Sequence, residues 1–150
     1  MLYDCPPIIL PTKIFVNLKS FVMPIATMPK TKQATKLLVV EDQGEMCLIL
    51  DLILSERNLE SDYVNNLLDA DEYLQKHKPP VIILDNQLPD GFGVDFITYV
   101  KKKYPGTKII MISGFSTARD IAMENGADAF LEKPFSLENV NHAIDSVLNR

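Results

Sequence analysis

The sequence predicts an α/β fold in which helices cover both faces of a five-stranded parallel sheet. Two observations predict it. Short apolar runs recur along the chain without polar residues inside them, a pattern typical of strands buried on both faces of a parallel sheet. Stretches with helical spacing separate these runs, and such alternation predicts a three-layer α/β sandwich with right-handed crossovers.

The regular pattern begins at Lys36, and five strands are expected after it. In chain order they lie at 37–40 (LLVV), around 63–64, at 81–84 (VIIL), at 109–112 (IIMI) and at 129–131 (AFL). The second strand lies in a stretch that mixes polar and apolar residues, SDYVNNLLDADEYL, so the pattern does not define its limits.

Five helices are expected between and after these strands. The first and last show apolar residues at i, i+3, i+4, i+7 and i+8, beginning at Met46 and at Val140, and Ser136 is a suitable N-cap for the last. The other three fit residues 67–77, 94–104 and 117–124. Turns between the elements are marked by Pro-Pro, Pro-Asp-Gly, Pro-Gly and Asn-Gly sequences.

Composition bounds the class of protein. A chain of 150 residues is long enough for one domain with its own core, and 47% hydrophobic and 23% charged residues are typical of a globular protein. The formal net charge of −5 argues against binding to nucleic acid, which relies on lysine and arginine. No apolar run reaches the roughly 18 residues of a transmembrane helix. Cys5 and Cys47 match no metal or disulfide spacing and fit a reducing cytoplasm.

The first 35 residues differ from the rest of the chain. They are apolar, but Lys13, Lys19 and five prolines interrupt them, and they lack the basic start and cleavage site of a signal peptide. We expect residues 1–35 to form an irregular, poorly ordered extension and residues 36–150 to form the domain.

Polar side chains follow four of the expected strands. Glu41 and Asp42 follow the first, Asp85 the third, Ser113 the fourth and Lys133 the fifth. In open α/β sheets, sites form beyond the carboxyl ends of the strands, so these side chains should converge. Carboxylates brought together repel one another unless a cation compensates. Their oxygens suit Mg²⁺, and the lysine and hydroxyl can hold a phosphoryl group.

Each of these residues has an ordinary interpretation when it is taken alone. Asp85 stands before Pro-Asp-Gly and could simply open a turn. Glu41 and Asp42 could be acids favoured at a helix N-terminus, and Lys133 could be a solvated lysine. The chemical interpretation rests on their occurrence together at sister strand ends.

Four motifs in this order resemble the receiver domain of two-component response regulators. They are VVEDQ (39–43), IILDNQLPDGFG (82–93), MISG (111–114) and GADAFLEKPF (126–135). The resemblance covers residues 36–150 and implies a flavodoxin-like (βα)5 fold with strand order 2-1-3-4-5.

The resemblance also implies a role for each acidic position. Asp85 matches the phosphoacceptor, which takes a phosphoryl group from the phosphohistidine of a kinase. Asp42 and Asp85 match the direct Mg²⁺ ligands, Glu41 a ligand that acts through water, and Gln87 the residue that lends its backbone carbonyl to the metal.

The remaining matched positions concern the phosphoryl group and the switch. Lys133 would pair with the phosphoryl oxygens, and the Lys133-Pro134 bond matches a cis peptide of the family. Ser113 would hydrogen-bond the phosphoryl group, and Phe130 would swing inward behind it. Two departures are small: Ser113 replaces the commoner threonine, and Phe130 lacks the hydroxyl of tyrosine, so its switch must act by packing.

We therefore expect a stand-alone signalling phosphoacceptor, not an enzyme with an external substrate. Its partners would be a histidine kinase or histidine phosphotransfer protein and a downstream effector. With no DNA-binding domain before the sequence ends at Arg150, output would come through protein contacts, either to an effector or within a phosphorelay. Two alternatives stay open: a phosphohydrolase of the haloacid dehalogenase type, which normally has an acid where Gln87 stands, and a phosphorylation-independent interaction module.

Overall fold

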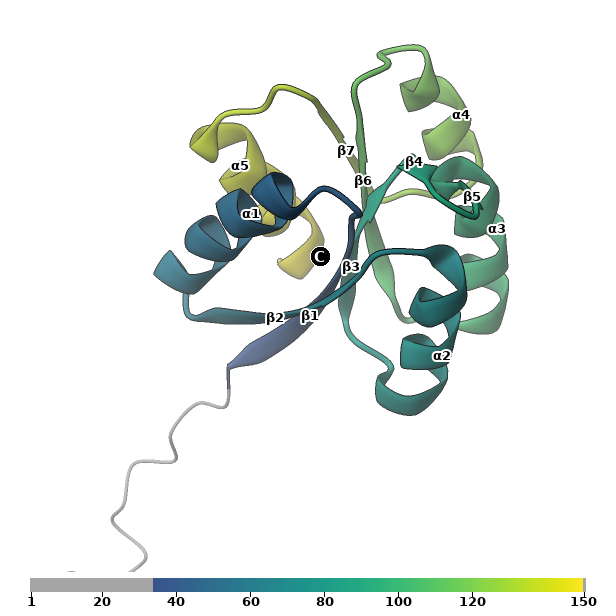
Figure 1. Ribbon diagram of the computed structural model, residues 1–150, viewed down its shortest axis with the longest axis horizontal. Coiled ribbons are helices and arrows are strands. Elements are labelled where there is room, and N and C mark those ends of the chain that lie inside the picture. The colour runs from purple at the N-terminus through teal and green to yellow at the C-terminus, as the bar shows by residue number, and fades with distance from the viewer. Residues whose placement is uncertain (1–33, 150) are drawn as a thin grey trace, which may run out of the picture. The chain divides into compact units, whose positions relative to one another are not determined.

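The main sheet has five parallel strands in the order β2-β1-β3-β6-β7 (Figure 1). The structure is a computed structural model that describes residues 34–149. The strands are β1 (Thr35–Val40), β2 (Leu59–Val64), β3 (Val81–Asp85), β6 (Lys108–Ser113) and β7 (Ala129–Glu132). Because β4 and β5 form a separate short hairpin, this order confirms the predicted flavodoxin-like topology 2-1-3-4-5. The predicted extension lies outside the described residues except for its last two, and Thr35 already belongs to β1.

All five predicted helices are present, with limits close to those expected. They are α1 (Gly44–Glu56), α2 (Leu67–His77), α3 (Gly93–Lys103), α4 (Ala118–Glu124) and α5 (Leu137–Leu148). Ser136 caps α5 as predicted, because its hydroxyl accepts a hydrogen bond from the Asn139 backbone amide, and the Asn139 side-chain oxygen accepts one from the Ser136 backbone amide.

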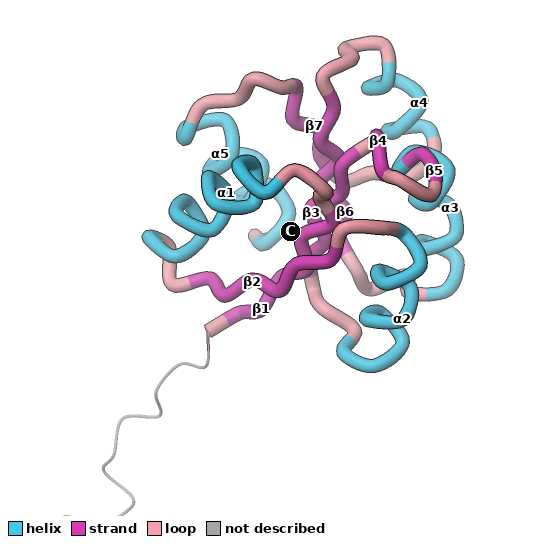
Figure 2. Tube along the Cα trace, in the orientation of Figure 1, coloured by secondary structure: helices cyan, strands magenta, loops and turns pink. Residues whose placement is uncertain are grey.

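The sheet separates two apolar cores, as Figures 1 and 2 show by the helices on its two sides. Alternate residues of each strand point to opposite faces, so Leu37 and Val39 face one core while Leu38 and Val40 face the other. Helices α1 and α5 cover the first core, and α2, α3 and α4 cover the second. Strands buried on both faces explain why β1, β3 and β6 appear in the sequence as continuous apolar runs.

Strand β2 shows why its limits could not be predicted. It lies at the edge of the sheet and pairs with β1 from Thr35↔Leu59 to Val40↔Val64. All of its residues are exposed or half-buried, so polar side chains are tolerated along its length. The apolar pattern therefore marked only its last two residues.

The loop after β3 contains a hairpin that the sequence did not predict. Residues β4 (Gln87–Leu88) and β5 (Gly91–Phe92) pair in antiparallel fashion around the turn at Pro89 and Asp90. The Pro-Asp-Gly sequence indicated a turn, but two-residue strands are too short to leave a pattern. Leu88 anchors the hairpin in the core beneath α2 and α3.

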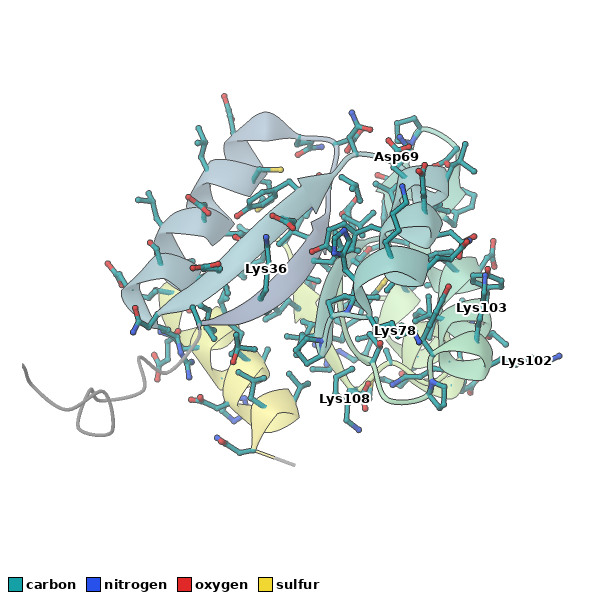
Figure 3. The ribbon with its side chains drawn as sticks, turned by 90° about the horizontal axis from the view of Figure 1, so that it is seen from below. Lys36, Asp69, Lys78, Lys102, Lys103 and Lys108 are labelled. Atoms are coloured by element: carbon teal, nitrogen blue, oxygen red, sulfur yellow. The ribbon has the colours of Figure 1, made fainter. Side chains whose placement is uncertain are left out.

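Most lysines of the described part lie at the amino ends of the strands. They precede or begin β1, β3 and β6, or occupy the last turns of α2 and α3. Figure 3 places Lys36, Lys78, Lys103 and Lys108 toward this end of the sheet, away from Asp69.

Within residues 34–149, no helix has both the length and the apolar character needed to cross a membrane.

Asp128, just before β7, ties α3 to the sheet. Its carboxylate pairs with the Lys101 ammonium and accepts the Ile109 amide at 2.9 Å. Burial by itself would raise the pKa of Asp128, but the hydrogen bonds from Lys101 and Ile109 outweigh it and hold the pKa below its ordinary value.

We expect Asp128→Asn to lower the free energy of unfolding at pH 7 by about 1–3 kcal/mol, because charged hydrogen bonds are lost in a half-buried place. The pKa of Asp128 is lower in the folded protein than in the unfolded chain. The ionised carboxylate therefore stabilises the folded state at pH values above its unfolded pKa, and this stabilisation is lost as the pH falls through its folded pKa. The difference from wild type, measured by urea unfolding, should therefore shrink in acid.

Glu72→Gln, which breaks the exposed pair with Lys76, is the control and should change stability much less. Equal losses in the two variants would contradict this account.

Candidate functional site

The polar residues that end four strands converge at one edge of the sheet, as predicted. Asp85 is the last residue of β3 and Ser113 the last of β6, while Glu41 and Lys133 come directly after β1 and β7. The Lys133 amide donates to the Ser113 carbonyl at 2.8 Å, which continues the β6–β7 ladder to this edge. Figure 2 shows the loops that follow β1, β6 and β7 on the same side of the sheet.

Lys133 links the two buried carboxylates. Its Nζ lies 2.8 Å from Asp85 Oδ1 and 2.9 Å from Glu41 Oε2. Burial alone would lower the pKa of Lys133, but the hydrogen bonds to Asp85 and Glu41 outweigh it and raise the pKa above its usual value. The ammonium is therefore a fixed positive charge at the strand ends. The Lys133-Pro134 bond is cis, as the resemblance implied.

Glu41, Asp42 and Asp85 form an acidic cluster. One oxygen from each lies within 4.8 Å of the others, so a single cation could contact all three. Glu41 and Asp85 are buried, whereas Asp42 is exposed. Burial raises the pKa of Glu41 despite the hydrogen bond from Lys133. Oxygen donors on a partly open edge fit Mg²⁺, which keeps several waters and takes few protein ligands.

The backbone after Asp85 is folded tightly around its carboxylate. The Gln87 amide donates to Asp85 Oδ2 at 2.9 Å, so both carboxylate oxygens have a donor. The Gly93 amide donates to the Asn86 carbonyl at 2.8 Å and closes the loop. A Cβ at Gly93 would lie 2.3 Å from the Asp85 carbonyl oxygen, so only glycine fits there.

Ser113 ends β6, and Phe130 lies on the neighbouring strand β7. Ser113 is almost fully buried, and its hydroxyl accepts a hydrogen bond from the Phe115 amide at 3.0 Å. Phe130 pairs in register with Met111 and is 8% exposed, so its ring is already buried in this structure. The Arg119 guanidinium lies over the ring, 4.6 Å from its centre. Sequence reasoning missed Arg119, because no spacing rule connects a residue of α4 with one of β7.

A hollow of about 380 Å³ opens beside the acidic cluster, where the N-terminus of α1 meets the loop after β2. Asp42, Cys47, Asn65 and Asp69 are among the residues that line it. Burial, followed by the charge of Glu41, raises the pKa of Cys47, so its thiol stays protonated near neutral pH. The hollow gives solvent and small ions access to the cluster from the α1 side.

Comparison with known proteins shows the family to which this fold belongs. A family model for the response regulator receiver domain matches residues 37–145. The chain belongs to this family, and it is a receiver domain of the two-component response regulators.

Individual relatives agree with this assignment. The chain is 28% identical over 115 residues to the response regulator protein PilR of Pseudomonas aeruginosa, covering 75% of this chain and 26% of that protein. It is 36% identical over 120 residues to a protein-glutamate methylesterase/protein-glutamine glutaminase of Pyrococcus abyssi, covering 76% of this chain and 32% of the relative. The chain therefore spans only about a quarter to a third of these relatives.

Solved structures show the same fold. A putative response regulator from Chloroflexus aurantiacus has a TM-score of 0.74 at 25% identity, covering 78% of this chain and 99% of that one. The beryllofluoride-activated NtrC4 receiver domain dimer has a TM-score of 0.70 at 33% identity, covering 77% and 98%.

Gly93 offers a test of how closely the loop packs. We expect Gly93→Ala to lower the free energy of unfolding by about 1–3 kcal/mol, because its Cβ would also meet Met111 and Leu84 within 3.1 Å. Gly106→Ala is the matched control, since nothing lies within 4 Å of its added Cβ. Urea unfolding of both variants measures the difference. A Gly93→Ala variant as stable as Gly106→Ala would show that the loop can move aside without loss.

Proposed function

We propose that Asp85 is the phosphoacceptor of this receiver domain and takes a phosphoryl group from a histidine kinase or histidine phosphotransfer protein. The observation that carries the proposal is the contact of Lys133 with Asp85 and Glu41 at the strand ends. This contact places a cation beside the buried Asp85 carboxylate, where it can also pair with the charge of an incoming phosphoryl group.

The proposed transfer uses groups that lie at the strand ends. A carboxylate oxygen of Asp85 attacks phosphorus, an O–P bond forms, and the P–N bond to the donor imidazole breaks and leaves its electron pair on nitrogen. Lys133 can then pair with a phosphoryl oxygen, and the Ser113 hydroxyl can hydrogen-bond another. Hydrolysis of the acyl phosphate by water restores Asp85.

Mg²⁺ fits this site as the cofactor. Asp42 and Asp85 would bind it directly, Glu41 through water, and Gln87 through its backbone carbonyl. Bound there, the ion would neutralise charge on the transferred group. The oxygen cluster supports this assignment, because hard carboxylate oxygens are the ligands that Mg²⁺ prefers.

The output is a two-state change around Ser113 and Phe130. The Ser113 hydroxyl now accepts a hydrogen bond from the Phe115 amide, and its own proton is available to donate to the phosphoryl group. Because Phe130 has no hydroxyl, it transmits the change by packing, and partners bind one arrangement better than the other. The domain thus acts as a signalling phosphoacceptor that assists its own phosphorylation, with an effector or a phosphorelay protein downstream.

Phosphoryl transfer can be tested with a small donor. After incubation with acetyl phosphate and Mg²⁺, the intact mass of the wild-type protein should rise by one phosphoryl group, about 80 Da. The gain should need Mg²⁺ and should be absent from Asp85→Asn. Asp95→Asn, which also removes one negative charge but lies exposed in the first turn of α3, is the control and should still be phosphorylated.

Rapid hydrolysis could hide the adduct, so beryllofluoride binding provides the second measurement. Wild type should bind it in the presence of Mg²⁺, and Asp85→Asn should not. If wild type neither gains mass nor binds beryllofluoride, the protein is a phosphorylation-independent module and the proposal fails.

The role of Ser113 can be tested separately from transfer. We expect Ser113→Ala to be phosphorylated at Asp85 but to show little phosphorylation-dependent change around Phe130, because its hydroxyl is lost. Aromatic ¹H–¹³C NMR of Phe130 with and without beryllofluoride measures the response. The same shift changes in variant and wild type would contradict this role.

A further inference from the structure

The hairpin after Asp85 is attached to the start of α2. Asp90, in the hairpin turn, accepts hydrogen bonds from the Leu67 amide at 2.9 Å and the Leu68 amide at 3.0 Å, one on each carboxylate oxygen. Leu67 and Leu68 are the first two residues of α2, and their amides have no partner within the helix.

This contact completes the cap of α2 from a distant part of the chain. The side chain of Asn66, the N-cap residue, accepts from the Asp69 amide at 2.7 Å, and the Leu67 and Leu68 amides donate to Asp90 instead. A carboxylate at a helix N-terminus also interacts favourably with the helix dipole. Burial would raise the pKa of Asp90, but the Leu67 and Leu68 amides outweigh it and lower the pKa, so Asp90 is ionised at neutral pH.

The other end of the hairpin reaches the acidic cluster. The Gln87 amide donates to Asp85 Oδ2, and Gln87 pairs in register with Phe92, while Leu88 pairs with Gly91. Gly91 approaches α2 closely, because a Cβ there would lie 3.2 Å from Leu67 Cδ1. Short contacts thus connect the Asp85 carboxylate, the hairpin and the first turn of α2.

We propose that Asp90 is a positioning residue that couples the acidic cluster to the N-terminus of α2. The proposal rests on the function above, because the coupled event is occupation of the cluster by Mg²⁺. The Asp90 carboxylate holds the hairpin in the position in which Gln87 can present its carbonyl to the ion. When the contact opens, the hairpin moves more freely and the ion loses part of its preorganised site.

Coupling of this kind is reciprocal. If the Asp90 contact strengthens Mg²⁺ binding by some factor, bound Mg²⁺ must strengthen the contact by the same factor. The first turn of α2 therefore becomes more rigid when the cluster is occupied. That turn contains Leu68, which is 74% exposed. Occupation of the site by Mg²⁺ therefore changes the mobility of an apolar residue that is accessible at the surface.

The test uses the full chain, with Asp90→Ala as the variant and Asp95→Ala as the matched control. Asp95 lies in the first turn of α3, is exposed, and makes no side-chain hydrogen bond within residues 34–149. Both substitutions remove one negative charge, but only the first removes the acceptor of the Leu67 and Leu68 amides. Mg²⁺ affinity is measured by titration calorimetry, and exchange of the Leu67 and Leu68 amides by NMR with and without Mg²⁺.

We expect Asp90→Ala to raise the Kd for Mg²⁺ about fivefold, and Asp95→Ala to change it less than about twofold. In wild type, Mg²⁺ should slow exchange of the Leu67 and Leu68 amides by about the same fivefold factor. In Asp90→Ala the slowing should disappear. Asp90→Asn keeps one acceptor oxygen and should fall between, which provides a second variant if Asp90→Ala does not fold.

Two results would overturn the coupling. If Asp90→Ala lowers the Tm but binds Mg²⁺ as tightly as Asp95→Ala does, Asp90 is a helix cap and nothing more. If Mg²⁺ leaves exchange of Leu67 and Leu68 unchanged in wild type, the two ends of the hairpin are independent. Failure of wild type itself to bind Mg²⁺ would instead overturn the proposed function, and the coupling with it.

Discussion

The interaction on which the site depends is the pairing of Lys133 with the buried carboxylates of Glu41 and Asp85. Two like charges at neighbouring strand ends would repel each other and favour protonation, and removing one member of a buried pair typically costs about 3–5 kcal/mol. The lysine comes from the strand at the far edge of the sheet, so it reaches the acids only when β1, β3, β6 and β7 are all in register. The site can therefore form only when these strands of the sheet are correctly paired.

The central sheet could be predicted because its strands are buried on both faces. Burial requires apolar residues at every position, and such runs are visible without any structure. The edge strand β2 and the hairpin β4–β5 follow a weaker rule, since one is largely accessible and the other has only two residues in each strand. A strand can be predicted when its burial requires a run of apolar residues. Strands that are exposed or very short do not require such a run, so the sequence shows no clear pattern for them.

The same reasoning separates the predictable part of the site from the rest. Glu41, Asp42, Asp85, Ser113 and Lys133 could be brought together because the ends of parallel strands meet at one edge. Arg119 over Phe130 and Asp90 at the start of α2 join elements whose relative position depends on how helices pack on the sheet. Neither residue type nor spacing carries that information in a single sequence. The strand order brings the acidic, hydroxyl and lysine side chains together. The packing of loops and helices on the sheet determines which residues, such as Arg119 and Asp90, contact the elements around them.

The division of the interior into two cores has a consequence for how this domain can change. Side chains on one face of the sheet pack with α1 and α5, and those on the other with α2, α3 and α4. Substitutions that share no neighbours have nearly additive effects on stability. The residues packed under α1 and α5 and those packed under α2 to α4 can therefore change in sequence separately, because the effects of such changes on stability add.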